Sequence, residues 1–296
     1  MDETLIKRRL VILGTLFLAV AVVWWPEFSG GKFRLFGVDT CDPSQLCVVF
    51  LDVGQGDAIF IQSPTGVQML IDSGRGDNAV LRELSQVMEF SDKDLDYIVA
   101  THPDADHIGG FAEVLARYGV SKVIRTENES DTAIWQSVEK AIEAERSEVY
   151  YATRGQSYDL GAGVVLEILF PDTDPREMES NTASIVAHLI FGETSLMLTG
   201  DSPKAIEEYL VLVEGEHLKS DVLKVGHHGS RTSTSELFLE HVAPTYAVIS
   251  AGKDNSYGHP HLEVTDLLFN SGVEILSTIE HGQVVIWSDG QVINLR

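Results

Sequence analysis

Basic residues and cysteines are both scarce in this sequence. Its 296 residues include 21 lysines and arginines against 45 aspartates and glutamates, for a formal net charge of −24. So few positive charges argue against a surface that holds nucleic acid through many phosphate contacts, although bound divalent cations would reverse the charge locally. Two cysteines are too few for a disulfide-rich scaffold. The chain is globular rather than disordered, because 44% of its residues are hydrophobic.

The motifs of three large enzyme classes are absent. The sequence contains no Gly-x-Ser-x-Gly elbow, no Walker phosphate loop and no Gly-x-Gly-x-x-Gly dinucleotide fingerprint. Serine hydrolases of the elbow type, P-loop nucleotidases and Rossmann oxidoreductases are therefore excluded.

A continuous apolar run covers residues 10–25. It is just under the about 17–25 residues that cross a bilayer. Lys7-Arg8-Arg9 precedes it and Trp24-Trp25-Pro26 ends it, which predicts an uncleaved membrane anchor over residues 1–26 with a cytoplasmic N-terminus. The small-x-small sequence Ala19-Val20-Ala21 leaves a cleaved secretion signal as the alternative. Both interpretations place the rest of the chain outside the cytoplasm.

Residues 27–45 have no clear period and are expected to form a linker. Near its end, Cys41 and Cys47 are close enough in sequence to close a small loop. Such a disulfide would persist outside the cytosol. Two unrelated thiols are the alternative.

From residue 46 onward, short β-rich runs alternate with helical patterns. Strands are expected near residues 48–53, 58–62, 67–71, 97–100, 122–125, 164–170, 183–191, 194–198, 222–225, 246–250, 274–277, 283–287 and 291–294, and helices near 78–89, 110–118, 132–147, 203–213, 233–241 and 262–271. Strands flanked by outer helices predict a layered α/β domain with two sheets in its middle.

The segment Thr101-His102-Pro103-Asp104-Ala105-Asp106-His107 follows an apolar run, and a helical pattern begins just after it. It therefore lies in a strand-to-helix turn, which gathers two histidines and two aspartates around one point. Imidazole and carboxylate groups are the ligands that hydrolytic metals prefer. The segment predicts a metal site; a solvated polar turn with an aspartate helix cap is the alternative.

At this turn the sequence resembles a known family. The pattern Thr-His-x-x-x-Asp-His after a strand is similar to the signature of the metallo-β-lactamase fold hydrolases. Residues 50–58 and the His-His-Gly-Ser segment further resemble the C-terminal hydrolase domain of the ComEC family of competence proteins, and the resemblance covers residues 46–296. Four more segments fit in the same order: Leu70-Ile71-Asp72-Ser73-Gly74, Leu198-Thr199-Gly200-Asp201, Val225-Gly226-His227-His228-Gly229-Ser230 and Tyr257-Gly258-His259-Pro260.

The resemblance implies a four-layer αββα sandwich over residues 46–296, with the metal site at one edge between the sheets. It implies two divalent ions, zinc or manganese, with His102 and Asp104 on one and Asp106 and His107 on the other. Asp201 matches the bridging aspartate of the family, although a Gly-Asp turn that caps the next helix would look the same.

Three later histidines remain open. His227 matches the late ligand of the fold, but His228 could take its place. Because adjacent side chains are expected to face opposite ways, one would be the ligand and the other would support the ligands or touch the substrate. His259 is a further candidate, as a ligand or as a donor to the transition state. The expected catalytic residues are Asp106, Asp201 and His259.

Two positions depart from the wider family. Asp104 replaces a histidine, which makes Mn²⁺ or Mg²⁺ more competitive with Zn²⁺ at that site. Where the family places another ligand histidine, this chain has Asn181, a poor substitute, so the first metal site is expected to be weaker or open. The nearest histidine, His188, is expected in the core of a strand.

Other residues are expected to support the ligands or contact the substrate. Asp72 would orient the His102 loop. Asp52 and Asp57 flank Gly54-Gln55-Gly56, whose glycines allow a close backbone approach. An anionic substrate group would be held by Ser230, Arg231 and Lys253.

The expected function is that of a membrane-anchored, extracytoplasmic, metal-dependent hydrolase similar to the ComEC hydrolase domain. The expected substrate is a phosphodiester, with single-stranded DNA as one form, and a single membrane span would need a separate channel protein for DNA uptake. Two alternatives stay open: a hydrolase of small phosphocholine-type or lactone esters, and a non-catalytic partner of a DNA-uptake or envelope assembly. The absent histidine near Asn181 favours the last, and the intact cluster from His102 to His107 opposes it.

Overall fold

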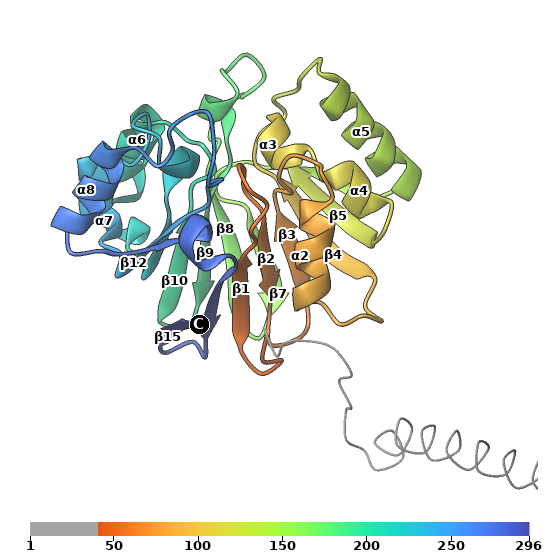
Figure 1. Cartoon of the computed structure of the whole chain (residues 1–296), viewed down its shortest axis with the longest axis horizontal. Coiled ribbons are helices and arrows are strands. Elements are labelled where there is room, and N and C mark those ends of the chain that lie inside the picture. Colours follow the sequence, from red (N-terminus) through yellow and green to blue (C-terminus); the bar gives the residue numbers. More distant parts are fainter. Residues whose placement is uncertain (1–40, 296) are drawn as a thin grey trace, which may run out of the picture. The chain divides into compact units, whose positions relative to one another are not determined.

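The computed structural model describes residues 41–295 (Figure 1). The expected anchor at residues 1–26 and the greater part of the expected linker at 27–45 lie outside the described residues. Within residues 41–295, no helix combines the length and the apolar character that a membrane crossing needs. A disulfide joins Cys41 to Cys47. Of the two possibilities for these cysteines, the bridged one is confirmed.

Eight strands form the first sheet, in the order β15-β14-β1-β2-β3-β4-β5-β6. The strands from β3 to β6 run parallel, and the other neighbours pair antiparallel. The carboxyl ends of β1, β3 and β4 therefore reach the same edge of the sheet. The strands are β1 (Leu46–Phe50), β2 (Ile59–Gln62), β3 (Gln68–Ile71), β4 (Asp94–Ala100), β5 (Gly119–Arg125), β6 (Glu148–Tyr151), β14 (Val284–Ser288) and β15 (Ile293–Leu295).

Seven strands form the second sheet, in the order β13-β12-β11-β10-β9-β8-β7. The strands from β10 to β13 run parallel, whereas β7, β8, β9 and β10 pair antiparallel in succession. The carboxyl ends of β10, β11 and β12 share one edge. The strands are β7 (Ser157–Gly161), β8 (Val164–Phe170), β9 (Val186–Phe191), β10 (Thr194–Leu198), β11 (Val222–Lys224), β12 (Tyr246–Ile249) and β13 (Glu274–Ser277).

Helices cover the outer face of each sheet (Figure 1). The first sheet carries α2 (Ala79–Val87), α4 (Phe111–Leu115) and α5 (Ala133–Glu145), which share a core with its strands. The second carries α6 (Lys204–Glu214), α7 (Glu236–Val242) and α8 (Leu262–Asn270) in the same way. Shorter elements lie in the connections: α3 (Ala105–Ile108), α9 (Thr278–His281) and the 3₁₀ turns η1 (Asn181–Ala183), η2 (Gly215–Leu218) and η3 (Gly226–Gly229).

The largest apolar residues between the sheets come from alternate positions of their strands. In β10, Leu196 and Leu198 belong to the core between the two sheets, whereas Met197 packs in the core under α6 and α7. This alternation follows from the two-residue period of a strand. With two sheets inside and helices on both outer faces, the molecule has the four-layer arrangement that the resemblance implies.

The structure differs from the sequence expectation at several elements. Strands β6 and β7 were not expected, because their residues are mostly exposed or half-buried and carry little apolar alternation. The helix expected at residues 110–118 is shorter, and α3 precedes it within the metal-ligand segment itself. That short helix fixes where the side chains of Asp106 and His107 point.

Hydrogen bonds join the loops of the two sheets at one edge of the sandwich. The amide of Ile185, before β9, donates to the carbonyl of Thr101, after β4, at 3.0 Å. In the second sheet the amide of His227 donates to the carbonyl of Gly200 at 3.1 Å. The segments that follow β4, β10 and β11 are thereby held beside one another.

Candidate metal centre

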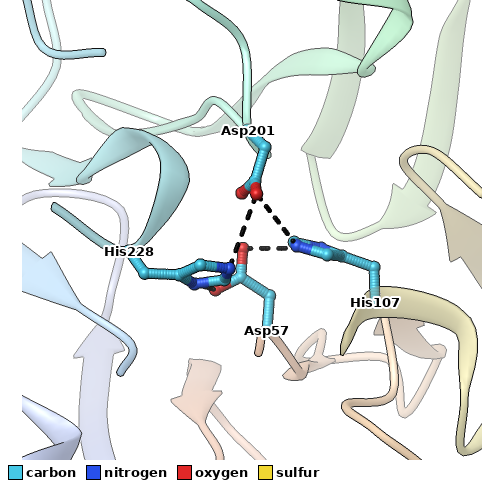
Figure 2. A group of neighbouring side chains, drawn as sticks. All are labelled: Asp57, His107, Asp201 and His228. Carbon is cyan, nitrogen blue, oxygen red and sulfur yellow. Dashed lines mark ion pairs between the residues drawn. The ribbon is translucent and has the colours of Figure 1, made fainter. Parts of the chain in front are cut away.

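Four buried side chains from distant parts of the chain meet at this edge (Figure 2). Asp57 follows β1, His107 lies in α3, Asp201 follows β10 and His228 lies in η3. One ligand atom from each lies within 4.8 Å of the others. In Figure 2 the Asp201 carboxylate faces the two imidazole rings from one side, and Asp57 approaches from the opposite side.

Four histidines converge on the Oδ2 atom of Asp201. Asp106 faces the same point, since its Oδ2 lies 3.6 Å from His228 Nε2. The shared carboxylate has the position expected of a bridging aspartate, and its metal-binding role stays a prediction. The distances to Asp201 Oδ2 are 3.3 Å from His107 Nε2, 3.5 Å from His228 Nε2, 3.6 Å from His227 Nε2 and 4.0 Å from His102 Nε2.

Hydrogen bonds that end at Asp72 determine which ring nitrogen carries the hydrogen in His107 and in His102. Asp72 Oδ2 accepts from His107 Nδ1 at 2.8 Å and from the Thr101 hydroxyl at 2.7 Å. Because the hydroxyl hydrogen is directed to Asp72, Thr101 Oγ1 accepts from His102 Nδ1, 3.0 Å away. Both rings therefore turn an Nε2 lone pair toward Asp201. Asp72 therefore bonds to both ends of the loop from Thr101 to His107, and its support of metal ligands stays a prediction.

The same argument applies to the two later histidines. His228 Nδ1 donates to the carbonyl of Ser250 at 3.0 Å, which leaves Nε2 free. His227 Nδ1 lies 3.2 Å from Thr232 Oγ1, whose own hydrogen goes to Ser230 Oγ. His227 Nδ1 must therefore donate to Thr232. All four imidazoles are fixed in the tautomer that metal binding through Nε2 requires.

The turn that carries His227 and His228 is not a continuation of a strand. Both residues have left-handed backbone conformations, with φ of 48° and 54°. Such angles are strained for residues other than glycine and are found at functional sites. Here they direct both Nε2 atoms to Asp201. The expectation that the two rings face opposite ways is wrong, because it assumed the alternation of a strand, and β11 ends at Lys224.

The side-chain atoms that face the centre fit a divalent cation. The Nε2 atoms of His102, His107 and His228 are buried and have no hydrogen-bond partner among residues 41–295, and the same holds for Asp201 Oδ1. Burying polar atoms without partners costs free energy unless a bound group satisfies them. Imidazole lone pairs and carboxylate oxygens are the donors that Zn²⁺ and Mn²⁺ take.

A buried lysine lies beside the centre and was not recognised in the sequence. Lys224 Nζ forms an ion pair with Asp57, donates to the carbonyl of Gly200 at 2.9 Å and lies 3.8 Å from Asp201 Oδ1. Both Lys224 and Asp57 have side chains that are 1% exposed. The signal in the sequence was a charged residue inside the apolar strand at residues 222–225. Its ion pair means that Asp57 balances charge as well as facing the ligands.

Burial and neighbouring charges shift the pKa values of the centre in different directions. Burial would raise the pKa of Asp201, but His228, His107 and Lys224 hold it well below its usual range. Burial would lower the pKa of His228, but the carboxylates of Asp201 and Asp57 raise it to about 9. Positive charge is therefore stabilised at the His228 ring, whereas burial lowers the pKa of His102 to about 3 and also lowers that of His227.

Asp104, one of the expected ligands, lies at the margin of the centre beside Ser180. Asp104 Oδ2 is 3.8 Å from His102 Nε2, and its other oxygen accepts from the Ser180 hydroxyl at 2.6 Å. Asn181, the next residue, begins η1, and its side-chain oxygen is buried with no partner in the described part of the chain. The position that lacks the family's histidine thus still presents a free oxygen donor.

The expected substrate-contacting residues are spread around the centre. Asp52 accepts from the Gly54 amide and shapes its turn rather than facing the ligands. The Ser230 hydroxyl is buried and accepts from Thr232, so it supports the histidine loop. Arg231 is exposed and contacts His261, and Lys253 is exposed in the loop before α8.

His259 lies beside the metal ligands without joining them. Its ring centre is 5.5 Å from that of His227 and 6.2 Å from that of His228. Burial, His227 and His228 lower the pKa of His259 to about 4, so the ring is neutral at pH 7. Its Nδ1 is buried without a hydrogen-bond partner among the described residues. This geometry suits the expected donor role better than that of a ligand.

A four-layer αββα sandwich with a buried histidine and aspartate centre at one edge defines a class of metal-dependent hydrolases. The chain belongs to the metallo-beta-lactamase superfamily, whose profile matches residues 51–253. The predicted resemblance to this fold is confirmed.

Curated relatives confirm the narrower resemblance to competence proteins. The chain is 33% identical over 271 residues to ComE operon protein 3 of Bacillus subtilis, covering 85% of this chain and 34% of that protein. It is 31% identical over 254 residues to competence protein ComA of Neisseria gonorrhoeae, covering 86% of this chain and 34% of that protein. The chain thus spans about a third of the length of these relatives.

Solved structures with low sequence identity share the fold. The diiron β-hydroxylase CmlA of Streptomyces venezuelae aligns with a TM-score of 0.54 at 14% identity, over 82% of this chain and 54% of that one. Zinc-bound PqqB of Methylobacterium extorquens aligns with a TM-score of 0.50 at 9% identity, over 75% of this chain and 85% of that one. At such low sequence identities, these similarities show only that the fold is shared.

Proposed function

We propose that the protein is a metal-dependent phosphodiesterase that cleaves single-stranded DNA. One observation carries the proposal: the four Nε2 lone pairs directed at Asp201, in a buried site with further carboxylates. When bound, divalent ions at such a centre lower the pKa of a water toward about 7 and polarise the scissile group. The metals named for two structural neighbours, iron and zinc, agree with divalent ions here.

The residues around the centre have distinct proposed roles. Asp72 and Thr101 hold the rings of His107 and His102 in place, so that no reorientation is needed during the reaction. Asp201 and Asp106 would keep the attacking water in line with the phosphorus. His259, neutral at pH 7, would donate a hydrogen bond to a phosphoryl oxygen as negative charge develops there.

The rim of the site supports a nucleotide strand as the substrate. Tyr257 is 55% exposed and stacks on His259, with ring centres 5.6 Å apart and planes tilted by 21°. Arg75 donates to the Tyr257 hydroxyl at 3.3 Å, and the exposed Arg231 contacts His261, whose ring packs against that of His259. An exposed aromatic shelf with guanidinium groups suits a stacked base and its phosphate. Few other positive charges are available in a chain of net charge −24.

The location and partners of the domain are also proposals. We propose that it lies outside the cytoplasm, held by the apolar N-terminal run or released after signal cleavage. The Cys41–Cys47 disulfide supports this, because disulfides persist in oxidising compartments. The similarity to competence proteins supports a role in DNA uptake beside a separate channel protein. A C-terminal reporter fusion active only in the cytosol would overturn this topology.

The activity is tested with three substrates under identical Mn²⁺ or Zn²⁺ conditions. These are single-stranded DNA, bis-p-nitrophenyl phosphate and a phosphocholine ester. We expect cleavage of DNA and of the small phosphodiester, and loss of both in Asp201→Asn. Tyr257→Ala should raise KM for DNA alone, whereas Phe90→Ala, at another exposed aromatic residue, should leave it unchanged.

Two results would replace the proposal with its alternatives. Turnover of small esters without DNA cleavage would identify a small-ester hydrolase. No turnover of any substrate, in protein shown to carry metal, would leave a non-catalytic partner of a DNA-uptake or envelope assembly.

A further inference from the structure

A second group of metal-binding side chains lies on the outer face of the second sheet. Glu167 in β8 is directly opposite His188 in β9, and His217 lies in η2 above them. One ring nitrogen from each histidine and one carboxylate oxygen lie within 4.8 Å of each other. The neighbours of His188 in the strand, Ala187 and Leu189, face the core between the sheets, so His188 points outward.

Hydrogen bonds fix the tautomer of His188. The Ser220 hydroxyl donates to the carbonyl of Leu218 at 3.0 Å, so it accepts from His188 Nε2 at 3.1 Å. Nδ1 therefore carries a lone pair. That atom is buried and has no hydrogen-bond partner within residues 41–295. Since His188 is only 3% exposed, its Nδ1 is a buried nitrogen whose lone pair no described residue satisfies.

The other two side chains are open to solvent. His217 and Glu167 have side chains that are 45% and 34% exposed, and His217 Nε2 lies 2.8 Å from Glu167 Oε2. The two imidazole rings meet edge to face, with centres 5.2 Å apart. An ion can therefore reach the group from solution, and water can fill its remaining positions.

We propose that Glu167, His188 and His217 bind a zinc ion, separate from the centre at Asp201. Two imidazoles and one carboxylate form a donor set that Zn²⁺ prefers. The centre at Asp201 is richer in carboxylates, which makes Mn²⁺ more competitive there. The zinc ion ties η2, the end of the connection from α6 to β11, to strands β8 and β9. The site therefore stabilises the fold and takes no part in the proposed hydrolysis.

The test measures zinc content and zinc-dependent melting in the full-length protein. Metal-free wild type, His217→Ala and Glu167→Gln are equilibrated with Zn²⁺ and dialysed, and bound metal is counted by elemental analysis. His241→Ala is the matched control, because the His241 ring bonds to the Leu237 carbonyl of its own helix and lies outside the cluster. Circular dichroism confirms that each variant is folded.

We expect both cluster variants to bind one equivalent of zinc less than wild type and the control. We also expect the rise in Tm on adding Zn²⁺ to shrink in the same two variants. Equal zinc content in wild type and both cluster variants would overturn the proposal. The outcome does not depend on the proposed hydrolysis, since Mn²⁺-dependent turnover, if present, should be the same in His217→Ala and wild type.

Discussion

The charges around Asp201 balance only because a lysine is buried with them. Lys224 pairs with Asp57 and lies near Asp201, and burial would lower the lysine's pKa, but these carboxylates raise it. The side chains of Lys224 and Asp57 are almost completely shielded from water. Each therefore depends on the other to neutralise its charge. Removing one partner of a buried pair leaves an uncompensated charge.

Lys224→Met is expected to lower the free energy of unfolding by about 3–5 kcal/mol. The substitution keeps most of the side-chain volume, so the loss reports the charge left on Asp57 rather than a cavity. Urea unfolding in the presence of a chelator measures it. The double variant Asp57→Asn with Lys224→Met should recover part of the loss; if it adds the two single losses instead, the pair is not coupled.

The order of the motifs predicted His102, His107 and Asp201 as members of one site, and two histidines are an unusual choice for a turn that binds nothing. The choice between His227 and His228 could not be made, since it depends on two left-handed residues that no local pattern announces. Lys224 was hidden for another reason. A lysine in an apolar strand is explained only by partners that arrive from β1 and β10.

At the scale of the elements, the loop between β1 and β2 packs closely against α3. Gly56 has φ of +132°, and a Cβ there would lie 2.2 Å from the Asp106 carbonyl oxygen. The Asp57 amide donates to that same carbonyl at 3.2 Å. The close backbone approach expected from Gly54-Gln55-Gly56 is therefore present at Gly56, and it sets the position of Asp106.

Gly56→Ala should displace Asp106 and weaken Mn²⁺ binding at least tenfold, together with a loss of about 1–3 kcal/mol of stability. Gly66→Ala is the matched control, since Gly66 also has positive φ, +85°, but its Cβ would meet no atom within 4 Å. The control should lose about 1 kcal/mol and bind Mn²⁺ normally. Equal metal affinity in the two variants would show that the approach at Gly56 does not position Asp106.

A buried carboxylate joins α6 to the start of α7. Glu207 accepts from the amides of Thr234 and Ser235, each at 2.7 Å, and burial raises its pKa to about 7. The unfolded chain releases this proton near pH 4.5, whereas the folded chain keeps it until about pH 7. Between these values the folded state binds more protons, so this group makes stability fall as pH rises.

Glu207→Gln should remove that dependence. The free energy of unfolding of the variant, relative to wild type, should rise by up to about 3 kcal/mol between pH 4.5 and pH 8. Urea unfolding at four pH values, with a chelator present, measures the difference. A difference that stays constant over this range would mean that Glu207 is ionised in the folded protein throughout.

Strands with strong apolar alternation were placed well by the sequence, and β8, β10 and β13 have the expected bounds. The exposed strands β6 and β7 were missed, because they are held by pairing with a neighbour rather than by a buried face. Local pattern cannot supply a partner strand from elsewhere in the chain.

At the scale of the whole molecule, the two sheets serve to bring four distant segments to one edge. The order of the strands places the carboxyl ends of β1 and β4 opposite those of β10 and β11. The pattern of strands and helices in the sequence predicted a layered α/β domain. The resemblance to the family predicted that the site lies at one edge, between the two sheets. The loops across that edge hold the ligands in a fixed geometry, so metal binding should require the folded sandwich and should stabilise it.

The central claim is that this edge holds divalent metal through Asp201, and Mn²⁺ binding by the full-length protein tests it most directly. Metal-free wild type and Asp201→Asn are titrated with Mn²⁺, and bound ion is measured by electron paramagnetic resonance, with circular dichroism to confirm folding. The account predicts up to two equivalents in wild type and a loss of most of them in Asp201→Asn. Less than about half an equivalent in folded wild type, or equal binding by the variant, would contradict it.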